Sequence, residues 1–370
     1  MKTSSTKIIK KITIFILTSM LLAGCAGKSQ GAQEGSEEQD MTDQKVSGND
    51  LSKDDSMVSL TDQITKLEDG LSAVNFSGED GFQEFLDDGG ADSDAGVMQY
   101  LAGKLLHGSA LTGTDQKMFG CSTLLAKEAD GNYLFGRNFD WENCEALVIR
   151  SQPKDEYASV STVNMDFIPG SQALPEKTRI LAALYAPLDG MNEKGLFISV
   201  NMIEDSASID QDTGKPDITT TTAVRLLLNQ ADSVENALQL LGEYDMHASM
   251  GYMVHFAIAD RTGRSVAVEY VDNKMVVTDT NVVTNYYLAK GSKNGIGTEQ
   301  SHTRFDLLQK TISEKSSMTQ EDVRDALNSV SKHNFHDGET TEWSIVMDPV
   351  SDTLTYYHRE QYDRKYIFQL

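Results

Sequence analysis

The chain has 370 residues, a formal net charge of −24 and only three cysteines. So acidic a chain is disfavoured as a partner for nucleic acid or anionic lipid surfaces, because like charges repel. Three cysteines cannot supply a disulfide framework. No second linker, internal repeat or heptad pattern follows the N-terminal region, and the remaining length fits one large domain.

The first 25 residues have the pattern of an export signal. A lysine-rich start precedes an apolar run, Ile12–Leu22, that is too short to span a bilayer. The run ends in Leu22-Ala23-Gly24-Cys25, which resembles a bacterial lipobox, where the cysteine becomes the acylated N-terminus. We therefore expect a lipoprotein signal peptide at 1–25, lipidation at Cys25 and a location on the outer face of the cytoplasmic membrane. The alternatives are an ordinary cleaved signal, in which Cys25 has no role, and a transmembrane helix.

Two segments separate this signal from the first strand pattern. Residues 26–57 are rich in Gly, Ser, Gln, Asp and Glu, and they cannot bury enough apolar surface to offset the entropy of ordering. We expect a disordered acidic linker there. From 58 to 118, apolar residues recur at intervals of three and four, which predicts helices at 60–74, 81–88 and 97–108.

After Phe119 the pattern changes to β structure. Two strand-like runs, 121–128 and 132–138, flank Asp130-Gly131, a strong hairpin turn signal. Further strands are expected at 146–151, 157–164, 179–186, 196–202, 253–260, 265–270, 274–279, 281–288, 343–348 and 353–358, and helices at 219–230, 233–244, 302–312 and 319–330. This order predicts an α+β fold with two packed antiparallel sheets and outer helices, in four αββα layers, rather than a doubly wound parallel sheet.

Cys121 stands at the start of this β region, near residues that a nucleophile needs. It follows Gly120, which permits unusual backbone angles and close approach to a carbonyl. The turn at Asp130-Gly131 returns Arg137 and Asp140 toward the same end of the sheet. Taken singly, a cysteine at a strand end is usually a small buried residue, and an arginine three residues before an aspartate is usually part of a solvated ion pair.

Four segments in order resemble the N-terminal nucleophile (Ntn) hydrolases of the choloylglycine hydrolase group. They are the hairpin ending in GRNFDW, then DGMNEKGLFISVN, VVTNYYL and SHTRFDLL. The group comprises linear amide C–N hydrolases such as bile salt hydrolases, penicillin V acylases and acid ceramidase-like enzymes, and it is related to the isopenicillin N acyltransferases. The likeness runs from about Phe119 to the C-terminus, and four matches in this order are hard to produce by chance.

The resemblance implies that the chain processes itself. The thiol of Cys121 would cut the Gly120–Cys121 bond and so free the α-amine of Cys121. An α-amine has a pKa of roughly 8, so it can serve as the base for the neighbouring thiol. Residues 58–120 then correspond to a helical propeptide or α-subunit, and residues 121–370 to the Ntn-hydrolase catalytic domain.

The resemblance also assigns roles to five further residues. Asp140 would hold the α-ammonium, and Arg137 would favour the thiolate or hold the substrate carbonyl. Asn285 would be an oxyanion donor, and Asn201 a second one if it faces the site, since a shift of one residue in a strand reverses the face. Arg304 would support the nucleophile region electrostatically. Alone, such an asparagine is usually a turn former, and an arginine in an amphipathic helix usually faces water.

The other cysteine and the histidines carry no assigned chemistry. Cys144 has no evident partner, so we expect a thiol there rather than a disulfide to Cys121, which would disable the nucleophile. The histidines show no metal-ligand spacing, so we expect neither a metal site nor a cofactor.

The expected function is a self-processing cysteine amidohydrolase that cleaves a linear N-acyl amide through a Cys121 thioester. Candidate substrates are a bile acid conjugate, an N-acyl amino acid, a penicillin V-like amide and a fatty acyl amide, with loops at 165–177, 204–217 and 291–300 selecting among them. The alternatives are an acyltransferase of the isopenicillin N type and a non-catalytic lipid-anchored binding protein. The expected partners are this small molecule and the membrane, and not nucleic acid. The cleaved N-terminal fragment is expected to stay bound, and the oligomeric state is left open.

Overall fold

A computed structural model describes residues 56–105, 120–168, 170–336 and 339–370. The expectations for the signal peptide, for Cys25 and for nearly all of the linker concern residues outside these ranges. The described residues form two large sheets and a parallel ribbon of β9 (Asp217–Thr219) with β10 (Asp245–His247). None of the helices in this described part has the length and apolarity needed to cross a bilayer.

The larger sheet has nine strands. Their order across the sheet is β1 (Thr65–Glu68), β2 (Leu71–Gly78), β5 (Ala146–Pro153), β6 (Ser159–Asn164), β7 (Asp189–Asn192), β8 (Leu196–Met202), β11 (Val254–Asp260), β12 (Ser265–Val271) and β13 (Lys274–Asp279). Neighbouring strands are antiparallel except for β2 and β5, which pair in parallel along the whole of β2.

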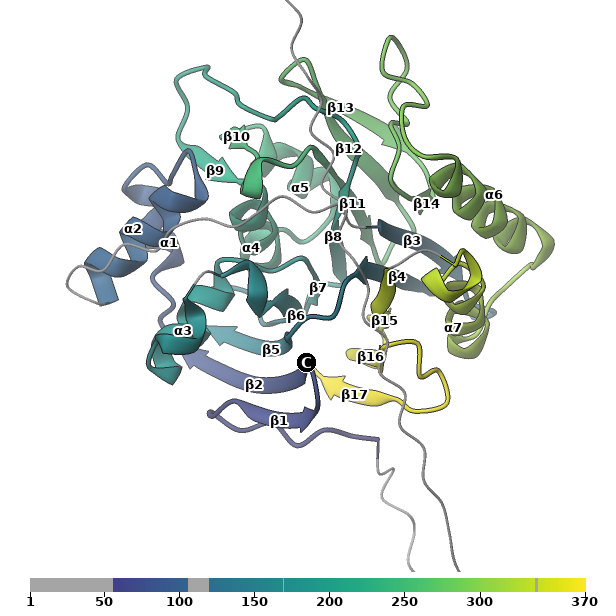
Figure 1. The fold of residues 1–370 in the computed structure, drawn as a ribbon, viewed down its shortest axis with the longest axis horizontal. Coiled ribbons are helices and arrows are strands. Elements are labelled where there is room, and N and C mark those ends of the chain that lie inside the picture. Colours follow the sequence, from purple (N-terminus) through teal and green to yellow (C-terminus); the bar gives the residue numbers. More distant parts are fainter. Residues whose placement is uncertain (1–55, 106–119, 169, 337–338) are drawn as a thin grey trace, which may run out of the picture. The chain divides into compact units, whose positions relative to one another are not determined.

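The smaller sheet has six antiparallel strands. Their order is β14 (Val282–Val283), β3 (Gly120–Lys127), β4 (Tyr133–Trp141), β15 (Thr340–Asp348), β16 (Thr353–His358) and β17 (Tyr366–Gln369). The helices that accompany the larger sheet are α1 (Phe82–Asp87), α2 (Asp94–Leu105), α3 (Glu176–Leu184), α4 (Thr220–Gln230) and α5 (Val234–Leu241), whereas α6 (Glu299–Glu314) and α7 (Gln320–Ser329) cover the smaller one (Figure 1). This is the four-layer αββα arrangement that the sequence predicts.

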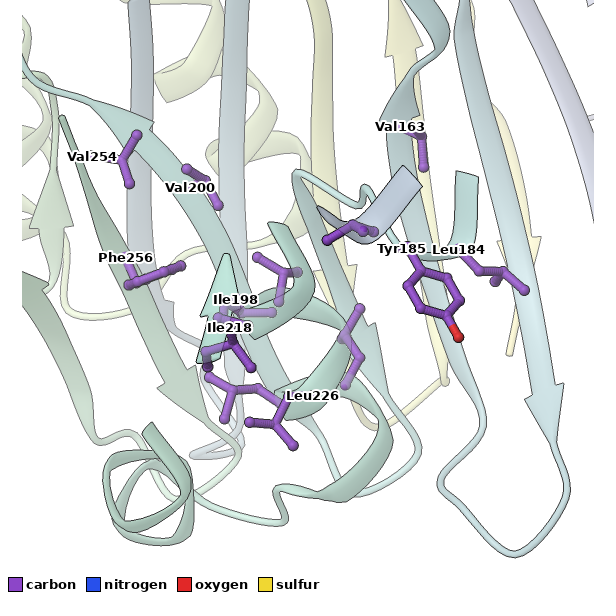
Figure 2. Packing of buried hydrophobic residues seen from close by; sticks show 14 of the residues in the cluster. Val163, Leu184, Tyr185, Ile198, Val200, Ile218, Leu226, Val254 and Phe256 are labelled. Carbon is purple, nitrogen blue, oxygen red and sulfur yellow. The ribbon is translucent and has the colours of Figure 1, made fainter. Parts of the chain in front are cut away.

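Buried apolar clusters fill the spaces between the layers. Figure 2 shows Ile198 of β8 near Ile218 and Leu226 on the helix-covered face of the larger sheet, where Val200 belongs to the same cluster. A second cluster lies between the two sheets and includes Cys121, and a third lies under α6 and α7. The candidate nucleophile is therefore part of the inter-sheet core.

The helix expected over 60–74 is wrong. This segment forms the hairpin β1–β2, whose turn residue Gly70 has a φ of +80°. Leu71 faces the inter-sheet core and Val74 faces the helix-side core, so β2 is buried on both faces, as is common for a strand with a parallel neighbour. The apolar spacing fits a helix or a strand, and pairing with β5 decides between them.

Residues 58–120 are therefore not an entirely helical region. The helices expected at 81–88 and 97–108 do form, as α1 and α2, the second described as far as Leu105. Because β2 belongs to the larger sheet, the segment before Cys121 is part of the structural core of the fold.

The strand expected over 179–186 is also wrong, since α3 occupies this segment. A short apolar run does not distinguish a buried strand from a buried helix. Pro175 directly before α3 and Glu176 in its first turn are the local signals that favour a helix start. Within the strand expected over 281–288, only Val282–Val283 form a strand, β14. The last strand, β17, has no counterpart among the predicted strands.

Candidate active site

Cys121 lies fully buried near the start of β3, where the register with β4 sets its surroundings. Gly120 lies opposite Asp140 in this register. Because side chains alternate along a strand, Arg137 and Asp140 point to opposite faces of the sheet. The sequence predicts both beside the cysteine. The structure places Arg137 in the inter-sheet space with the thiol, and Asp140 on the face that α6 and α7 cover.

Arg137 is the centre of the inter-sheet half of the site. Its Nε donates to Asp189 Oδ2 at 2.6 Å, and its two terminal nitrogens donate to Asn201 Oδ1 at 2.6 Å and to the carbonyl of Val200 at 3.0 Å. The thiol of Cys121 points to the same Val200 carbonyl, at 3.8 Å. A guanidinium and the candidate nucleophile thus share one main-chain acceptor, and the buried charge of Arg137 is balanced by Asp189.

Arg304 is the centre of the other half. From α6 it donates to the carbonyl of Cys121 at 2.6 Å, to Ser122 Oγ at 2.7 Å and to Asn285 Oδ1 at 2.8 Å. It also lies 3.5 Å from Asp140 Oδ2. An arginine on an amphipathic helix usually faces water, but this one is 1% exposed and holds the main chain of the nucleophile.

Asn285 holds the main-chain nitrogen of Cys121. Its Oδ1 accepts from that N–H at 2.6 Å and from Arg304, so the two donors fix which way the amide points. Its Nδ2 donates to the carbonyl of Met202 at 2.7 Å, and its own N–H donates to Ser301 Oγ at 2.6 Å. The nitrogen that an oxyanion donor needs is therefore engaged in the uncut chain, where Asn285 acts through its oxygen.

Asn201 faces the inter-sheet space, which is the face that a role in the site requires. The alternating residues Ile198 and Val200 face the helices instead. Its Oδ1 accepts from Arg137, whereas its buried Nδ2 has no hydrogen-bond partner among the described residues. An unpaired buried amide nitrogen is costly unless a ligand or an intermediate uses it, so this nitrogen is free to donate to one, unlike that of Asn285.

Burial dominates the electrostatics of the site. It raises the pKa of the Cys121 thiol, against the opposing charges of Arg137 and Arg304, while Asp140 adds to the rise. Burial also raises the pKa of Asp140, against the opposing charges of Arg304 and Lys332. The thiol of the uncut chain therefore holds its proton more firmly than a free cysteine does, and it needs a base before it can attack.

Several site residues escape sequence reasoning. Asp189 opens the DGMNEKG segment and reads there as a turn residue, yet a buried Arg137 requires a buried carboxylate. Ser301, Thr341 and Lys332 have no local pattern that marks them. They reach the site because sheet pairing and helix packing bring their elements to it.

The second cysteine is a free thiol, as expected. Both Cys121 and Cys144 are buried and unbridged. Burial raises the pKa of the Cys144 thiol well above its ordinary value, with the nearby Glu342 adding to the rise. Within the described ranges, no group of three or more His, Cys, Asp or Glu side chains is arranged to hold a metal ion.

The chain has two packed, largely antiparallel sheets between helices, and a cysteine at a strand start whose main-chain nitrogen is held by a side chain. This is the arrangement that the resemblance to Ntn hydrolases predicts. Residues 121–287 match the family model described as linear amide C-N hydrolases, choloylglycine hydrolase family. This part of the chain is similar to that family, and the match begins at Cys121.

Similar proteins include a curated relative and two solved structures. A bile salt hydrolase/transferase of Clostridium perfringens (strain 13 / Type A) is 30% identical over 170 residues, which are 44% of this chain and 51% of that protein. The match thus spans about half the length of this curated relative. A crystal structure of a variant of conjugated bile acid hydrolase from Clostridium perfringens has a TM-score of 0.50 and 20% identity, covering 64% of this chain and 89% of that chain. A penicillin V acylase from Agrobacterium tumefaciens has a TM-score of 0.48 and 18% identity, over 64% of this chain and 83% of that one.

Proposed function

We propose that the chain is a self-processing cysteine amidohydrolase that acts on linear N-acyl amides. The observation that carries this proposal is the hold on the main chain of Cys121: Asn285 accepts from its N–H, and Arg304 donates to its carbonyl. A cysteine that works through its thiol alone needs no such hold on its nitrogen. A cysteine whose nitrogen becomes the catalytic base does. The family of residues 121–287 supports the same reaction class.

The proposed processing step releases that nitrogen. Sγ of Cys121 attacks the carbonyl carbon of Gly120, the new S–C bond forms, and the C–N bond to Cys121 breaks. The leaving nitrogen takes the proton that the thiol gives up and becomes an α-amine. Water then hydrolyses the thioester and leaves Gly120 as a carboxylate. Asp140 lies opposite Gly120 in the strand register and is placed to pair with the new amine.

The same atoms then serve the amide substrate. The α-amine takes the proton of the Cys121 thiol, Sγ attacks the substrate carbonyl, and the amine passes the proton to the leaving nitrogen. The unpaired Nδ2 of Asn201 is available for the oxyanion, and Arg137 favours the thiolate. Water completes the cycle by hydrolysing the thioester.

A mostly apolar pocket shares Phe167 with the surroundings of Cys121, and it favours an apolar acyl group. It has about 500 Å³ of empty space that is open to solvent. Phe167, in one of the loops expected to select the substrate, lies edge-on to Trp141 at 5.1 Å and is 6.4 Å from Phe139, the strand neighbour of Cys121. The residues that line the pocket are mostly apolar and come in part from α2 and α3: Asp94, Val97, Met98, Phe167, Ile168, Ala182, Tyr185, Ala186, Thr221, Ser249 and Met250.

A hydrolysis panel tests the activity and this acyl preference together. The panel comprises N-acyl glycines of increasing chain length, a bile acid conjugate and penicillin V, with the Cys121→Ala variant as blank. We expect kcat/KM to rise about fourfold for each methylene that enters the pocket, at about 0.8 kcal/mol per methylene. Ala186→Leu should remove the preference for long chains, and Ala129→Leu, in an exposed turn, should not. No amine released from any member would contradict the proposal.

We also propose that the N-terminal fragment stays bound after processing. It contributes β2, which pairs with β5 along its whole length, and the buried Phe82 and Phe85. We expect both fragments to co-elute in size-exclusion chromatography and to separate only in denaturant, as mass spectrometry of the peak would report. Val74→Asp should release the fragment because it buries an unpaired charge, whereas the matched Ser77→Asp lies on an exposed position. A large fragment that elutes alone from the unaltered protein would refute this.

The location on the outer face of the membrane remains part of the proposal. The lipobox at Cys25 supports it. The lipid would be on the N-terminal fragment, whereas the thiol of Cys121 is on the C-terminal fragment. The activity therefore stays at the membrane only if the two fragments remain bound. Radiolabelled palmitate in the small fragment, absent from a Cys25→Ala variant, is the expected result.

A further inference from the structure

Lys332 is a buried lysine beside the bond that is to be cut. It begins a short 3-10 helix (Lys332–Asn334) after α7 and is 4% exposed. Its Nζ lies 2.7 Å from Gln300 Oε1 and 2.7 Å from Glu339 Oε2. Burying an ammonium is costly even when it is paired, so its presence at this point requires an explanation.

The stem of this lysine forms one wall around Gly120. A Cβ added at Gly120 would lie 2.6 Å from Asp140 Oδ2 and 2.8 Å from Lys332 Cε, and both distances are shorter than real contacts allow. The φ of Gly120 is not in the left-handed region. A larger residue at position 120 would therefore displace Asp140 or Lys332, and the reason is space rather than an unusual backbone angle.

The main chain of Lys332 is linked to the same carboxylate. Its N–H donates to Thr341 Oγ1 at 3.0 Å, and that hydroxyl donates to Asp140 Oδ1 at 2.7 Å. Asp140 Oδ1 thus accepts a hydrogen bond from Thr341. Asp140 Oδ2 and Lys332 Cε both border the position of a Cβ at residue 120. The side chain of Lys332 therefore borders the position that a Cβ at residue 120 would occupy, and its main chain is linked to Asp140 through Thr341.

We propose that Lys332 is a positioning residue for processing: its side chain, with Asp140, disfavours any residue larger than glycine at position 120, and its ammonium, which is paired with Glu339, adds positive charge beside the Asp140 carboxylate that receives the new α-amine. This role rests on the proposed self-processing. The lysine then has a steric and an electrostatic function, and a substitution that removes only the charge tests the second.

The electrostatic part has a defined direction with pH. Burial raises the pKa of Asp140, and Arg304 and then Lys332 oppose that rise. Removing the ammonium lets the pKa of Asp140 rise further, so its carboxylate is lost at a higher pH as the solution is acidified. The other titratable and charged groups around this pair are Arg137, Cys121, Tyr362 and Glu339.

The test follows processing of the full chain with time across a pH series, by gel and intact mass after cell-free synthesis. Lys332→Met keeps the stem and removes the charge, and Lys332→Arg keeps the charge. We expect Lys332→Met to slow cleavage about tenfold, as is typical when one member of a coupled charge network is lost, and to move the acid limb of the profile to higher pH. Lys332→Arg should keep the wild-type limb, and so should Lys310→Met, whose side chain is 69% exposed on α6.

Each other outcome overturns the role. Wild-type rates and pH dependence in Lys332→Met, or equal losses in the Met and Arg variants with no shift of the acid limb, would show a merely structural lysine. If Lys332→Met lacks a cooperative thermal transition, Lys332→Gln replaces it in the same comparison, since it keeps a polar contact without the charge. A wild-type chain that stays uncut would refute self-processing itself, and it does so before any variant is compared.

Discussion

Cys121→Ala is expected to yield a full-length chain with no amidase activity. The alanine has no thiol to attack the carbonyl of Gly120, so the bond stays intact and the α-amine that serves as base never forms. Loss of the nucleophile and of its base together should lower kcat/KM by at least about a thousandfold. Intact mass and release of amine from the best member of the amide panel are the two measurements.

Two further variants make this result specific. Cys121→Ser keeps a weaker nucleophile whose main chain still donates to Asn285 and accepts from Arg304, so we expect slow cleavage at the same bond. Cys144→Ala removes the other buried thiol and should be cut and active, with at most a modest loss of stability. Cleavage of Cys121→Ala at Gly120, or a folded Cys144→Ala that stays uncut, would contradict the assignment.

Arg137→Met should destabilise the fold by about 3–5 kcal/mol, because it leaves the buried carboxylate of Asp189 without its ion pair. Activity should be lost as well, since Arg137 is the largest opposing influence on the raised pKa of the Cys121 thiol. The free energy of unfolding in urea and the hydrolysis rate under native conditions measure the two effects separately.

The double variant Arg137→Met/Asp189→Asn separates the two effects. The introduced asparagine carries no charge, and its side-chain oxygen can still accept from Trp343 Nε1, which donates to Asp189 at 2.9 Å. Much of the stability should return, but the activity should not.

Burial raises the pKa of Asp189, so in the single variant this carboxyl takes up a proton in the folded state at a pH where the unfolded chain does not. The stability deficit of the single variant should therefore shrink as the pH falls. A deficit that is independent of pH would argue against an unpaired carboxylate.

The residue types of the site are recognisable in the sequence because the chemistry demands them. Arg137, Asp140, Asn285 and Arg304 all lie around Cys121, on one face or the other of the smaller sheet, and the order of elements predicts the four layers. What each side chain does there is less predictable. Asn285 presents its oxygen to the nucleophile and uses its nitrogen elsewhere, and this depends on Met202 and Arg304, which are distant in the chain.

Local patterns by themselves determined most helices and strands and the turn that folds β4 back on β3, and they indicated Cys121 as the candidate nucleophile. Tertiary structure decided the rest. It made 60–74 a pair of strands because β5 offered β2 a buried partner, and it made 179–186 a helix packed on the larger sheet. It also placed Arg137 and Asp140 on opposite faces and brought Lys332 against Gly120. The spacing of apolar residues does not specify which element they pack against, and a charged residue does not specify its ion-pair partner. A charge can be buried only where the tertiary structure places a partner of opposite charge beside it.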